Sequence, residues 1–574
     1  AQMVADELGA DWDSVSVAEA PGVPEYANFA LGKGFLLGDA DLPEWLVPSI
    51  DGAFLKLTQL MDLQITGGST SVQATGVYGM RVAGAAAREL LIEAAASSWS
   101  VPVGEVTIQQ SMISHAASNR EAPMAEFAAA AAQLSPPADP ALKTPEEFTI
   151  MGESKPRLDI PAKVDGSARF GIDVILPDMK YAAVFASPVF GGSVSYIDDS
   201  AARAMPGVVD VVNLDNAVAV VADGYWQAQQ ALKTLDVCFD DAHAKTTSQE
   251  TIFTQFTAAL DSGEGNEDLV LGDASAAFAR ADSILEAEYR VPYLAHATME
   301  PMNATARVTE SQCEVWTGSQ NPLGFRGAIA EAVEMPEEQV TIHNEYLGGG
   351  FGRRATPDYA VQAARIAKAS GHPLQLIWSR EEDTRQDHYR PAVLSRFKAG
   401  FDAQGEPIAW QNHFVDKHEP AEATHIPYAI ANLDVRDFPS PTHVPFGAWR
   451  SVDHSQHSYF TESFIDEMAH DRGVDPYQFR RTLLAHNPRL RKVLDTAAEM
   501  AGWGEAMAPG WGRGIAVQES FGTLVAQVLD VEVTDGKVRV DRVFCAVDPG
   551  FAVSPDGLIA QMESGIIFGL TAAL

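Results

Sequence analysis

The sequence has 574 residues, of which 46% are hydrophobic and 21% charged, so it can bury several large cores and is predicted to form more than one domain. Forty basic and 78 acidic side chains give a formal net charge of −38, which disfavours binding to nucleic acid or to anionic lipid surfaces. No apolar run approaches the ~20 residues that a membrane-spanning helix needs.

Three cysteines, Cys238, Cys313 and Cys545, lie far apart in the sequence. They cannot hold an iron–sulfur cluster, and we expect each to be a small buried hydrophobic residue. If the chain carries out redox chemistry, its electrons must therefore pass through a bound cofactor and a second domain or chain. The sequence begins at Ala1 without a signal peptide and ends at Leu574 in an apolar stretch, so we expect it to represent part of a longer gene product.

Residues 1–134 are predicted to contain two amphipathic helices and two short strands. The helices are expected at 53–61 and 77–99, and the strands at 14–17 and 106–108. The proline-rich segment SPPADP at 135–140 then begins a linker that extends to residue 155.

Residues 156–245 are predicted to form a small α/β domain, because three apolar strand-like runs accompany one short helix. The strands are expected at 181–189, 208–214 and 217–221, and the helix at 224–232. Residues 246–282 are expected to form a connecting helical segment.

Residues 283–574 alternate short strands with helices, which predicts mixed α+β layers. Helices are expected at 322–333 and 358–369, a strand at 340–346, and a hairpin turn at 534–537. Without a repeat or a low-complexity segment, function is expected to depend on particular sites on a globular scaffold.

A glycine-rich segment, GGGFGRR at 348–354, follows the strand expected at 340–346 and precedes a helix. Its backbone N–H groups could converge on an anion or on an oxygen bound to a metal, because glycine lets the main chain approach closely. The spacing differs from that of a dinucleotide-binding GxGxxG motif, and a glycine-rich turn alone is more often an ordinary turn.

Two further segments carry polar groups that could act in a site. TGSQNP at 317–322 contains Gln320, whose amide can donate a hydrogen bond to an oxygen on a metal, and GAWRS at 447–451 contains Arg450, which can hold an anion or orient a carbonyl. Taken singly, each segment is equally consistent with an ordinary loop, and Arg450 with a structural salt bridge.

Taken in this order, the three segments resemble the molybdenum-pocket signature of the xanthine oxidase family. Other segments continue the resemblance over essentially the whole sequence. PRLDIPAKVDG at 156–166 resembles the entry to the family's small hammerhead domain, HATMEP at 296–301 resembles its next landmark, and REED at 380–383 with HYRP at 388–391 continues the pattern. We assign no catalysis to residues 380–383 and 388–391, which also suit a charged strand-to-loop turn.

The segment GGSTS at 67–71 precedes the hammerhead segment, an order that is closest to the isoquinoline 1-oxidoreductase and membrane-associated aldehyde dehydrogenase branch. The resemblance implies an α+β, multidomain molybdenum-hydroxylase large subunit with a small α/β hammerhead domain at 156–245. Residues 1–134 and 283–574 are then the two parts of the molybdopterin-binding domain, the second incomplete at its C-terminus.

The resemblance also implies the residues of the site. Gln320 and Arg450 are expected to be catalytic, and no side chain is expected to bind the metal directly. The cofactor-binding residues are expected to be Gly67, Gly68, Ser69, Thr70, Ser71, Gln320, Gly350, Phe351, Gly352, Arg353, Arg450 and Gln561. Without the resemblance, residues 67–71 suit a capped helix start and Gln561 a polar helix face.

Two segments of the family pattern are missing, one before Ala1 and one after Leu574. The second carries the family's general base, a glutamate, and neither Glu519 nor Glu563 matches its motif. The catalytic base therefore stays unassigned.

The resemblance implies a molybdenum enzyme that hydroxylates an aldehyde or an N-heteroaromatic compound with oxygen from water. The expected cofactor is molybdopterin cytosine dinucleotide. Electrons are expected to leave through a small [2Fe–2S] subunit, with a cytochrome c subunit as a further candidate partner. The bacterial periplasm is the favoured location and the cytoplasm the alternative. The rival hypothesis is a noncatalytic binding or assembly protein, or a cofactor-free fragment, on the same scaffold.

Overall fold

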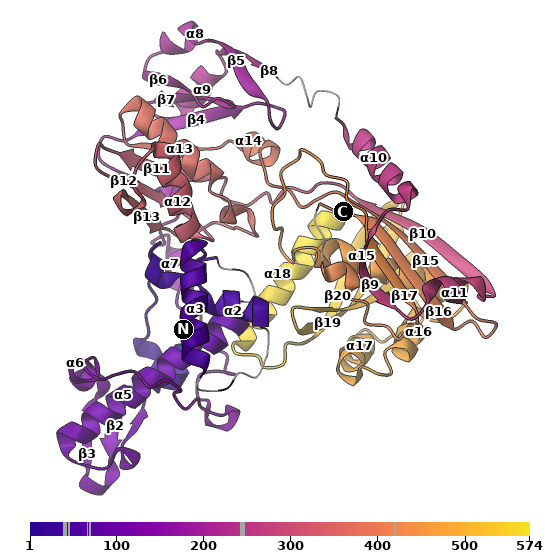
Figure 1. The fold of residues 1–574 in the computed structure, drawn as a ribbon, viewed down its shortest axis with the longest axis horizontal. Coiled ribbons are helices and arrows are strands. Elements are labelled where there is room, and N and C mark those ends of the chain that lie inside the picture. Colours follow the sequence, from indigo (N-terminus) through magenta and orange to yellow (C-terminus); the bar gives the residue numbers. More distant parts are fainter. Residues whose placement is uncertain (38–42, 44–45, 66, 68–70, 241–246, 418–420) are drawn as a thin grey trace.

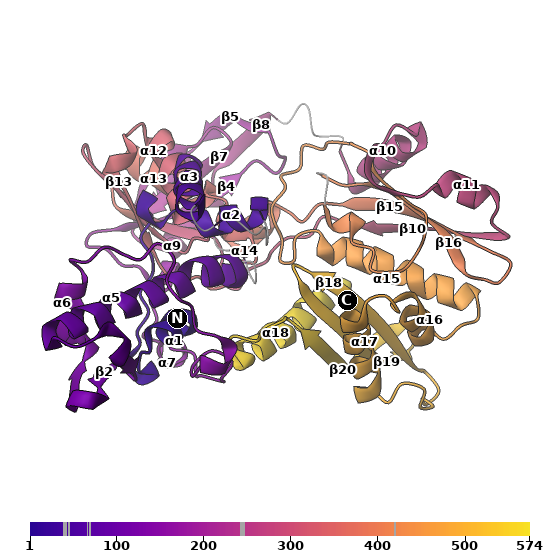
Figure 2. The same cartoon turned by 60° about the horizontal axis from the view of Figure 1, so that its bottom comes forward.

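The computed structural model describes residues 1–574 except 38–42, 44–45, 66, 68–70, 241–246 and 418–420. The chain has the predicted α+β, multidomain fold. Helix α18 (Pro555–Ala573) lies between an N-terminal helical region and a region of mainly antiparallel sheets, with a third region built on a seven-stranded sheet beside them (Figures 1 and 2).

The N-terminal region packs helices against a short three-stranded sheet. Helix α5 continues directly from a π-helical segment, Ser71–Arg81, so the helix expected from residue 77 is α-helical only from Val82. The strand expected at 14–17 is wrong, because Asp11 accepts the Asp13 N–H and begins a 3₁₀ turn there. The elements are α1 (Gln2–Leu8), α2 (Phe29–Leu37), α3 (Val47–Leu60), α5 (Val82–Trp99), α6 (Ala128–Ala131), β1 (Thr107–Gln109), β2 (Met112–His115) and β3 (Arg120–Pro123).

The seven-stranded sheet has the order β13-β12-β11-β14-β4-β7-β6. Its strands are β4 (Lys180–Ala186), β6 (Val208–Asn213), β7 (Ala217–Ala222), β11 (Asn303–Val308), β12 (Cys313–Thr317), β13 (Val340–Asn344) and β14 (Leu374–Ile377). All six residues of β7 are buried, as a strand covered on both faces requires. The strands expected near 181, 208, 217 and 340 are confirmed.

Helices cover both faces of this sheet. Apolar side chains of α12 (Pro322–Val333) and α13 (Asp358–Ser370) pack on one face, and those of α8 (Ser200–Arg203) and α9 (Tyr225–Leu232) pack on the other. The remaining elements are α7 (Ile160–Asp165), α14 (Arg380–Arg385) and a ribbon of β5 (Ser193–Asp198) with β8 (Asp236–Asp240). Cys238 in this ribbon is exposed, which corrects the expectation that all three cysteines are buried.

Because this sheet joins strands from 156–245 with strands from 283–574, the two ranges are structurally continuous. Their limits as separate domains stay a prediction.

A five-stranded sheet of order β10-β15-β16-β17-β9 lies in the region of mainly antiparallel sheets, and β16 and β17 are its parallel pair. Its elements are β9 (Asn266–Leu271), β10 (Ser283–Val291), β15 (Val393–Phe401), β16 (Pro407–Val415), β17 (Leu433–Asp437), α10 (Gln249–Ser262) and α11 (Ala274–Ala279). The segment 246–282 therefore contains an edge strand as well as the helices expected there.

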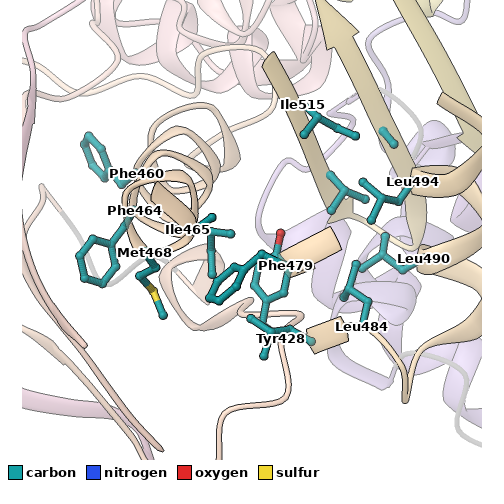
Figure 3. Close-up of a cluster of buried hydrophobic side chains, with 14 of the residues drawn as sticks. Tyr428, Phe460, Phe464, Ile465, Met468, Phe479, Leu484, Leu490, Leu494 and Ile515 are labelled. Atoms are coloured by element: carbon teal, nitrogen blue, oxygen red, sulfur yellow. The ribbon is translucent and has the colours of Figure 1, made fainter. Parts of the chain in front are cut away.

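The largest hydrophobic core joins this sheet to a three-stranded sheet through helix α15 (His454–Asp471). Phe460, Phe464 and Met468 of α15 point into it, beside Phe479 and Leu494 (Figure 3). The other elements are α16 (Pro476–Leu483), α17 (Pro488–Met500), β18 (Trp511–Ser520), β19 (Thr523–Thr534) and β20 (Lys537–Asp548). Asp535 and Gly536, both with positive φ, form the predicted hairpin turn between β19 and β20.

The start of α18 is attached to the N-terminal region. The Gly152 N–H donates to the carbonyl of Val553 at 3.0 Å, and the rings of Phe148 and Phe551 are 5.4 Å apart. The fully buried carboxylate of Asp6 accepts the N–H groups of residues 149–151. These contacts hold α18 between the two regions. No helix in the described part of the chain is both long and apolar enough to cross a membrane.

His454, the first residue of α15, makes stability depend on pH. Burial lowers the pKa of this imidazole from 6.5 to about 4, with smaller contributions from His425 and His457. Between these pH values the folded state binds fewer protons than the unfolded state, so stability falls as pH decreases from 6.5 towards 4. We expect His454→Asn to reduce this loss in urea unfolding, whereas exposed His443→Asn should follow the wild type. Equal pH dependence in all three proteins would contradict the assignment.

Candidate functional site

A tight turn at residues 348–352 connects β13 to the helices that follow. Phe351 and Gly352 both have positive φ, of 56° and 110°, and a non-glycine residue in this conformation marks a strained backbone. A Cβ added to Gly352 would lie 1.4 Å from the carbonyl oxygen of Ala448, so only glycine allows the turn to pack against the loop that contains Arg450.

Gln320 lies against this turn, immediately before α12. Its Oε1 accepts the Gly352 N–H at 3.0 Å, and its own N–H donates to the Arg354 carbonyl at 2.9 Å. The first bond orients the amide so that Nε2 lies on the side opposite Gly352. The Gly352 N–H, expected to face the cofactor, is therefore used to position Gln320.

The N–H groups of Gly349, Gly350 and Phe351 form a second set of donors. Throughout the part of the chain that the structure describes, no protein group accepts a hydrogen bond from them. Successive N–H groups in a turn of this kind suit the oxygens of an anionic group.

Arg450 meets residues of α18 that are more than a hundred positions away in sequence. Nη1 donates to Ser564 Oγ at 2.9 Å, and Nη2 lies 3.2 Å from both the carbonyl and the Oε1 of Gln561. Partial burial lowers the pKa of the guanidinium. Ser451 and Val452, which follow it, both have positive φ. The structure thus brings two of the expected site residues, Arg450 and Gln561, into direct contact.

Three aromatic rings join the turn, the arginine loop and α18. The Phe568 ring lies 4.6 Å from that of Phe351 and 4.5 Å from that of Trp449, between centroids. The Arg450 guanidinium lies 5.6 Å from the Phe568 centroid. Sequence reasoning missed Phe568 and Ser564, although both lie on the same helix as Gln561, at spacings of seven and three residues.

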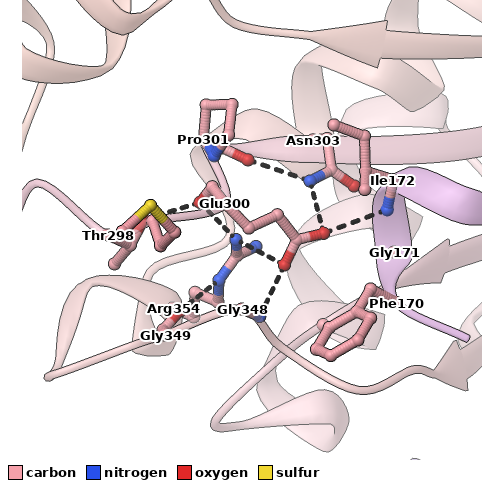
Figure 4. A network of polar contacts seen from close by, with 12 residues as sticks. Phe170, Gly171, Ile172, Thr298, Glu300, Pro301, Asn303, Gly348, Gly349 and Arg354 are labelled. Atoms are coloured by element: carbon pink, nitrogen blue, oxygen red, sulfur yellow. Dashed lines mark hydrogen bonds and ion pairs between the residues drawn. The ribbon is translucent and has the colours of Figure 1, made fainter. Parts of the chain in front are cut away.

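Glu300 forms a buried polar network behind the turn (Figure 4). Its carboxylate accepts the N–H groups of Gly348 and Ile172 at 2.7 and 3.0 Å and the Asn303 amide at 2.9 Å. It also pairs with Arg354 at 3.0 Å. The HATMEP segment was predicted only as a landmark, and nothing in its spacing indicated these partners.

Arg353 points away from the front of the turn. Its side chain is 1% exposed, and it forms ion pairs with Asp358 at 2.8 Å and Asp387 at 3.0 Å. Any contact of Arg353 with a cofactor would therefore have to come from its backbone.

Residues 67–71 can be followed only in part. Gly68, Ser69 and Thr70 lie outside the described residues. The Gly67 N–H donates to Ser71 Oγ at 2.9 Å, and the Ser71 N–H donates to the Gly67 carbonyl at 3.1 Å. Ser71 begins the π-helical segment, a conformation that is frequent at functional sites.

The donor set around the turn fits a molybdenum–pterin group, which presents phosphate oxygens and oxygens on the metal. The N–H groups of residues 349–351, the Gln320 amide and the Arg450 guanidinium all suit such oxygens. In the described ranges, no group of three or more His, Cys, Asp or Glu side chains could hold a metal ion.

Comparison with known proteins agrees with the family resemblance found in the sequence. A family model described as a molybdopterin cofactor-binding domain matches residues 261–484. The isoquinoline 1-oxidoreductase subunit beta of Brevundimonas diminuta is 30% identical and aligns with 100% of this chain and 78% of its own length. The membrane-bound aldehyde dehydrogenase of Gluconacetobacter polyoxogenes is 28% identical, with 100% and 77% covered.

Solved structures share the fold. Quinoline 2-oxidoreductase from Pseudomonas putida 86 has a TM-score of 0.55 at 19% identity, covering 68% of this chain and 62% of that one. Aldehyde oxidoreductase from Desulfovibrio gigas has a TM-score of 0.52 at 18% identity, covering 94% and 62%. The chain therefore spans about three quarters of the two curated relatives and less than two thirds of the two solved chains.

Proposed function

The chain belongs to the molybdenum-binding subunits of the xanthine oxidase family, which are oxidoreductases, and we propose that it hydroxylates an aldehyde or an N-heteroaromatic compound with oxygen from water. Two electrons from each substrate would pass to an iron–sulfur partner. The two relatives are named for one substrate of each class, isoquinoline and an aldehyde.

One observation carries the proposal. The Phe351 turn, the Arg450 loop and α18 come from three distant parts of the sequence, and they meet through the Arg450–Gln561 contact and the Phe568 ring. Gln320, which was assigned to the same site, is bonded to the same turn. A rigid constellation of donors assembled by a packed scaffold is what a bound cofactor and its substrate require.

Each group has a role in this proposal. The N–H groups of residues 349–351 and the Gln320 amide hold the oxygens of the molybdenum group, and Arg450 orients the substrate. When bound, the cofactor supplies the two-electron oxidation and the activation of water. The Phe568 ring covers one side of the half-buried Arg450 guanidinium, and this partial burial strengthens its electrostatic interaction with a polar substrate group.

The finer assignments extend this proposal. Cytosine dinucleotide is the proposed form of the pterin, held by Gly67, residues 68–70, Ser71 and Gln561. The proposed electron acceptor is a separate [2Fe–2S] subunit, since cysteines of this chain cannot hold such a cluster, with a cytochrome c subunit as a further partner. We place the assembled enzyme in the bacterial periplasm, with the cytoplasm as the alternative.

The proposal is tested by measuring the metal and nucleotide content of the intact gene product, purified with its natural partners. We expect stoichiometric molybdenum by elemental analysis and a pterin cytosine dinucleotide by mass spectrometry. Properly assembled protein that lacks molybdenum and binds only another protein would overturn the enzyme proposal and support a binding or assembly role.

Arg450→Lys is expected to lower kcat/KM by about 10- to 100-fold, because an ammonium cannot reproduce the forked hydrogen bonds to Ser564 and Gln561. Gln320→Leu should lower it similarly, since leucine has no amide to hold the turn. Turnover is measured on protein with confirmed molybdenum occupancy. Unchanged turnover in both variants would remove the two residues from these roles.

A further inference from the structure

His296 is a fully buried histidine whose two ring nitrogens both face oxygen atoms. Nδ1 lies 3.0 and 3.1 Å from the two carboxylate oxygens of Asp387, and Nε2 lies 3.3 Å from the carbonyl oxygen of Ala448. The side chains of His296 and Asp387 are 0% and 2% exposed. The His296 backbone N–H also donates to Asp387, so the carboxylate fixes both the backbone and the ring.

Asp387 connects the imidazole to a buried charged cluster. Its carboxylate also pairs with Arg353, and Arg353 pairs with Asp358, with His388 3.8 Å from Asp358. A carboxylate that a buried guanidinium holds in place has a fixed position, so it fixes the ring of His296 as well.

The acceptor of Nε2 connects His296 to the proposed site. Ala448 is two residues before Arg450, and its carbonyl oxygen is also the atom that packs closest to Gly352. A Cβ built on Gly352 would lie 3.3 Å from His296 Nε2. The imidazole therefore occupies the junction between the glycine turn and the arginine loop, and it makes a polar contact with the loop from behind.

We propose that His296, held by Asp387, is a positioning residue that fixes the Ala448 carbonyl and so sets the position of Arg450 relative to the Gly352 turn. The ring does not touch the substrate, and it acts through the loop. The effect on catalysis rests on the proposed function, whereas the effect on the loop can be measured without it.

The first test is hydrogen exchange in His296→Gln, followed by mass spectrometry. The Gly447 N–H donates to Tyr389 and the Val452 N–H donates to Trp449, so both amides should be protected in the wild type. We expect exchange in 447–452 to accelerate at least about tenfold in the variant, with β19 and β20 unchanged. His413→Gln is the matched control, because His413 also pairs with a carboxylate, Asp434, at 3.0 Å but away from the site. Unchanged exchange in 447–452, or equal acceleration throughout the chain, would overturn the proposal.

A second measurement is made on the wild type, and the variant is needed only to assign the signal. In protein with ¹⁵N-labelled histidine, Nε2 of His296, identified by its absence in His296→Gln, should show the shift of an N–H nitrogen, because the Ala448 carbonyl can only accept a hydrogen bond. An unprotonated Nε2 would overturn the contact with the loop.

The catalytic consequence is measured on the molybdenum-loaded holoenzyme with an aldehyde and an N-heterocycle as probes. Displacement of Arg450 in His296→Gln should lower kcat/KM about tenfold at unchanged molybdenum content, whereas His413→Gln should match the wild type. Wild-type kcat/KM in the variant would overturn the link between His296 and Arg450. If the wild type contains no molybdenum, the proposed function fails, while the exchange experiment still decides whether His296 holds the loop.

Discussion

Gly352→Ala is expected to lower kcat about 100-fold or more and to reduce molybdenum content, because the added methyl group cannot fit between the turn and the arginine loop. Its Cβ would overlap the Ala448 carbonyl oxygen at 1.4 Å, and the backbone fixes the positions of both atoms, so no side-chain rotation can relieve the clash. Either the turn or the Arg450 loop must move. Movement of the turn would also break the bond between the Gly352 N–H and Gln320.

Gly371→Ala is the matched control for this substitution. Gly371 also has a positive φ, of 70°, at the end of α13, but a Cβ there would meet no atom within 4 Å. The control should therefore cost only the ~1–2 kcal/mol of a left-handed alanine and keep its molybdenum. Elemental analysis and turnover are compared in the two variants. Wild-type metal content and activity in Gly352→Ala would show that the turn and the loop do not act as one unit.

The sequence predicted correctly those helices and turns whose ends are determined by neighbouring residues. Helix α12 has the predicted bounds, because Pro322 suits the first turn and the residues after Val333 leave the helical conformation. The hairpin at 534–537 is also correct, since Asp535 and Gly536 tolerate positive φ. The strand predicted at 14–17 failed for an equally local reason, the Asp11 cap, which competes with an extended chain.

The site could be predicted only in outline. Gln320 and Arg450 were identified through the family resemblance. Their positions in the sequence do not indicate that Gln320 bonds to Gly352 or that Arg450 bonds to Gln561. The partners of the Glu300 carboxylate come from three separate segments, around Ile172, Asn303 and residues 348–354, so they depend on the complete tertiary fold. The buried pairs of Arg353 likewise come from two elements, and only the structure shows that its side chain points away from the turn.

Glu300→Ala should destabilise the protein by about 3–5 kcal/mol, because it leaves Arg354 as an uncompensated buried charge. Arg354 is 0% exposed and Glu300 7% exposed. The substitution would also remove the acceptor of the Gly348 and Ile172 N–H groups. These groups link the segment after α7 to the turn of the proposed site, so local disorder should spread to both. The free energy of unfolding is measured by urea denaturation.

Glu345→Ala is the control variant, because it removes an equally buried carboxylate without leaving a buried arginine unpaired. The Glu345 side chain is likewise 7% exposed, but its partner Arg169 is 60% exposed, and a guanidinium left in solvent carries little penalty. We therefore expect Glu345→Ala to cost at most about 1 kcal/mol through this pair. Because Glu300 also accepts the Gly348 and Ile172 N–H groups and the Asn303 amide, a difference between the variants measures the whole buried network of Glu300, Arg354 included. Equal destabilisation would mean that Arg354 and these donors find water or other acceptors once Glu300 is removed.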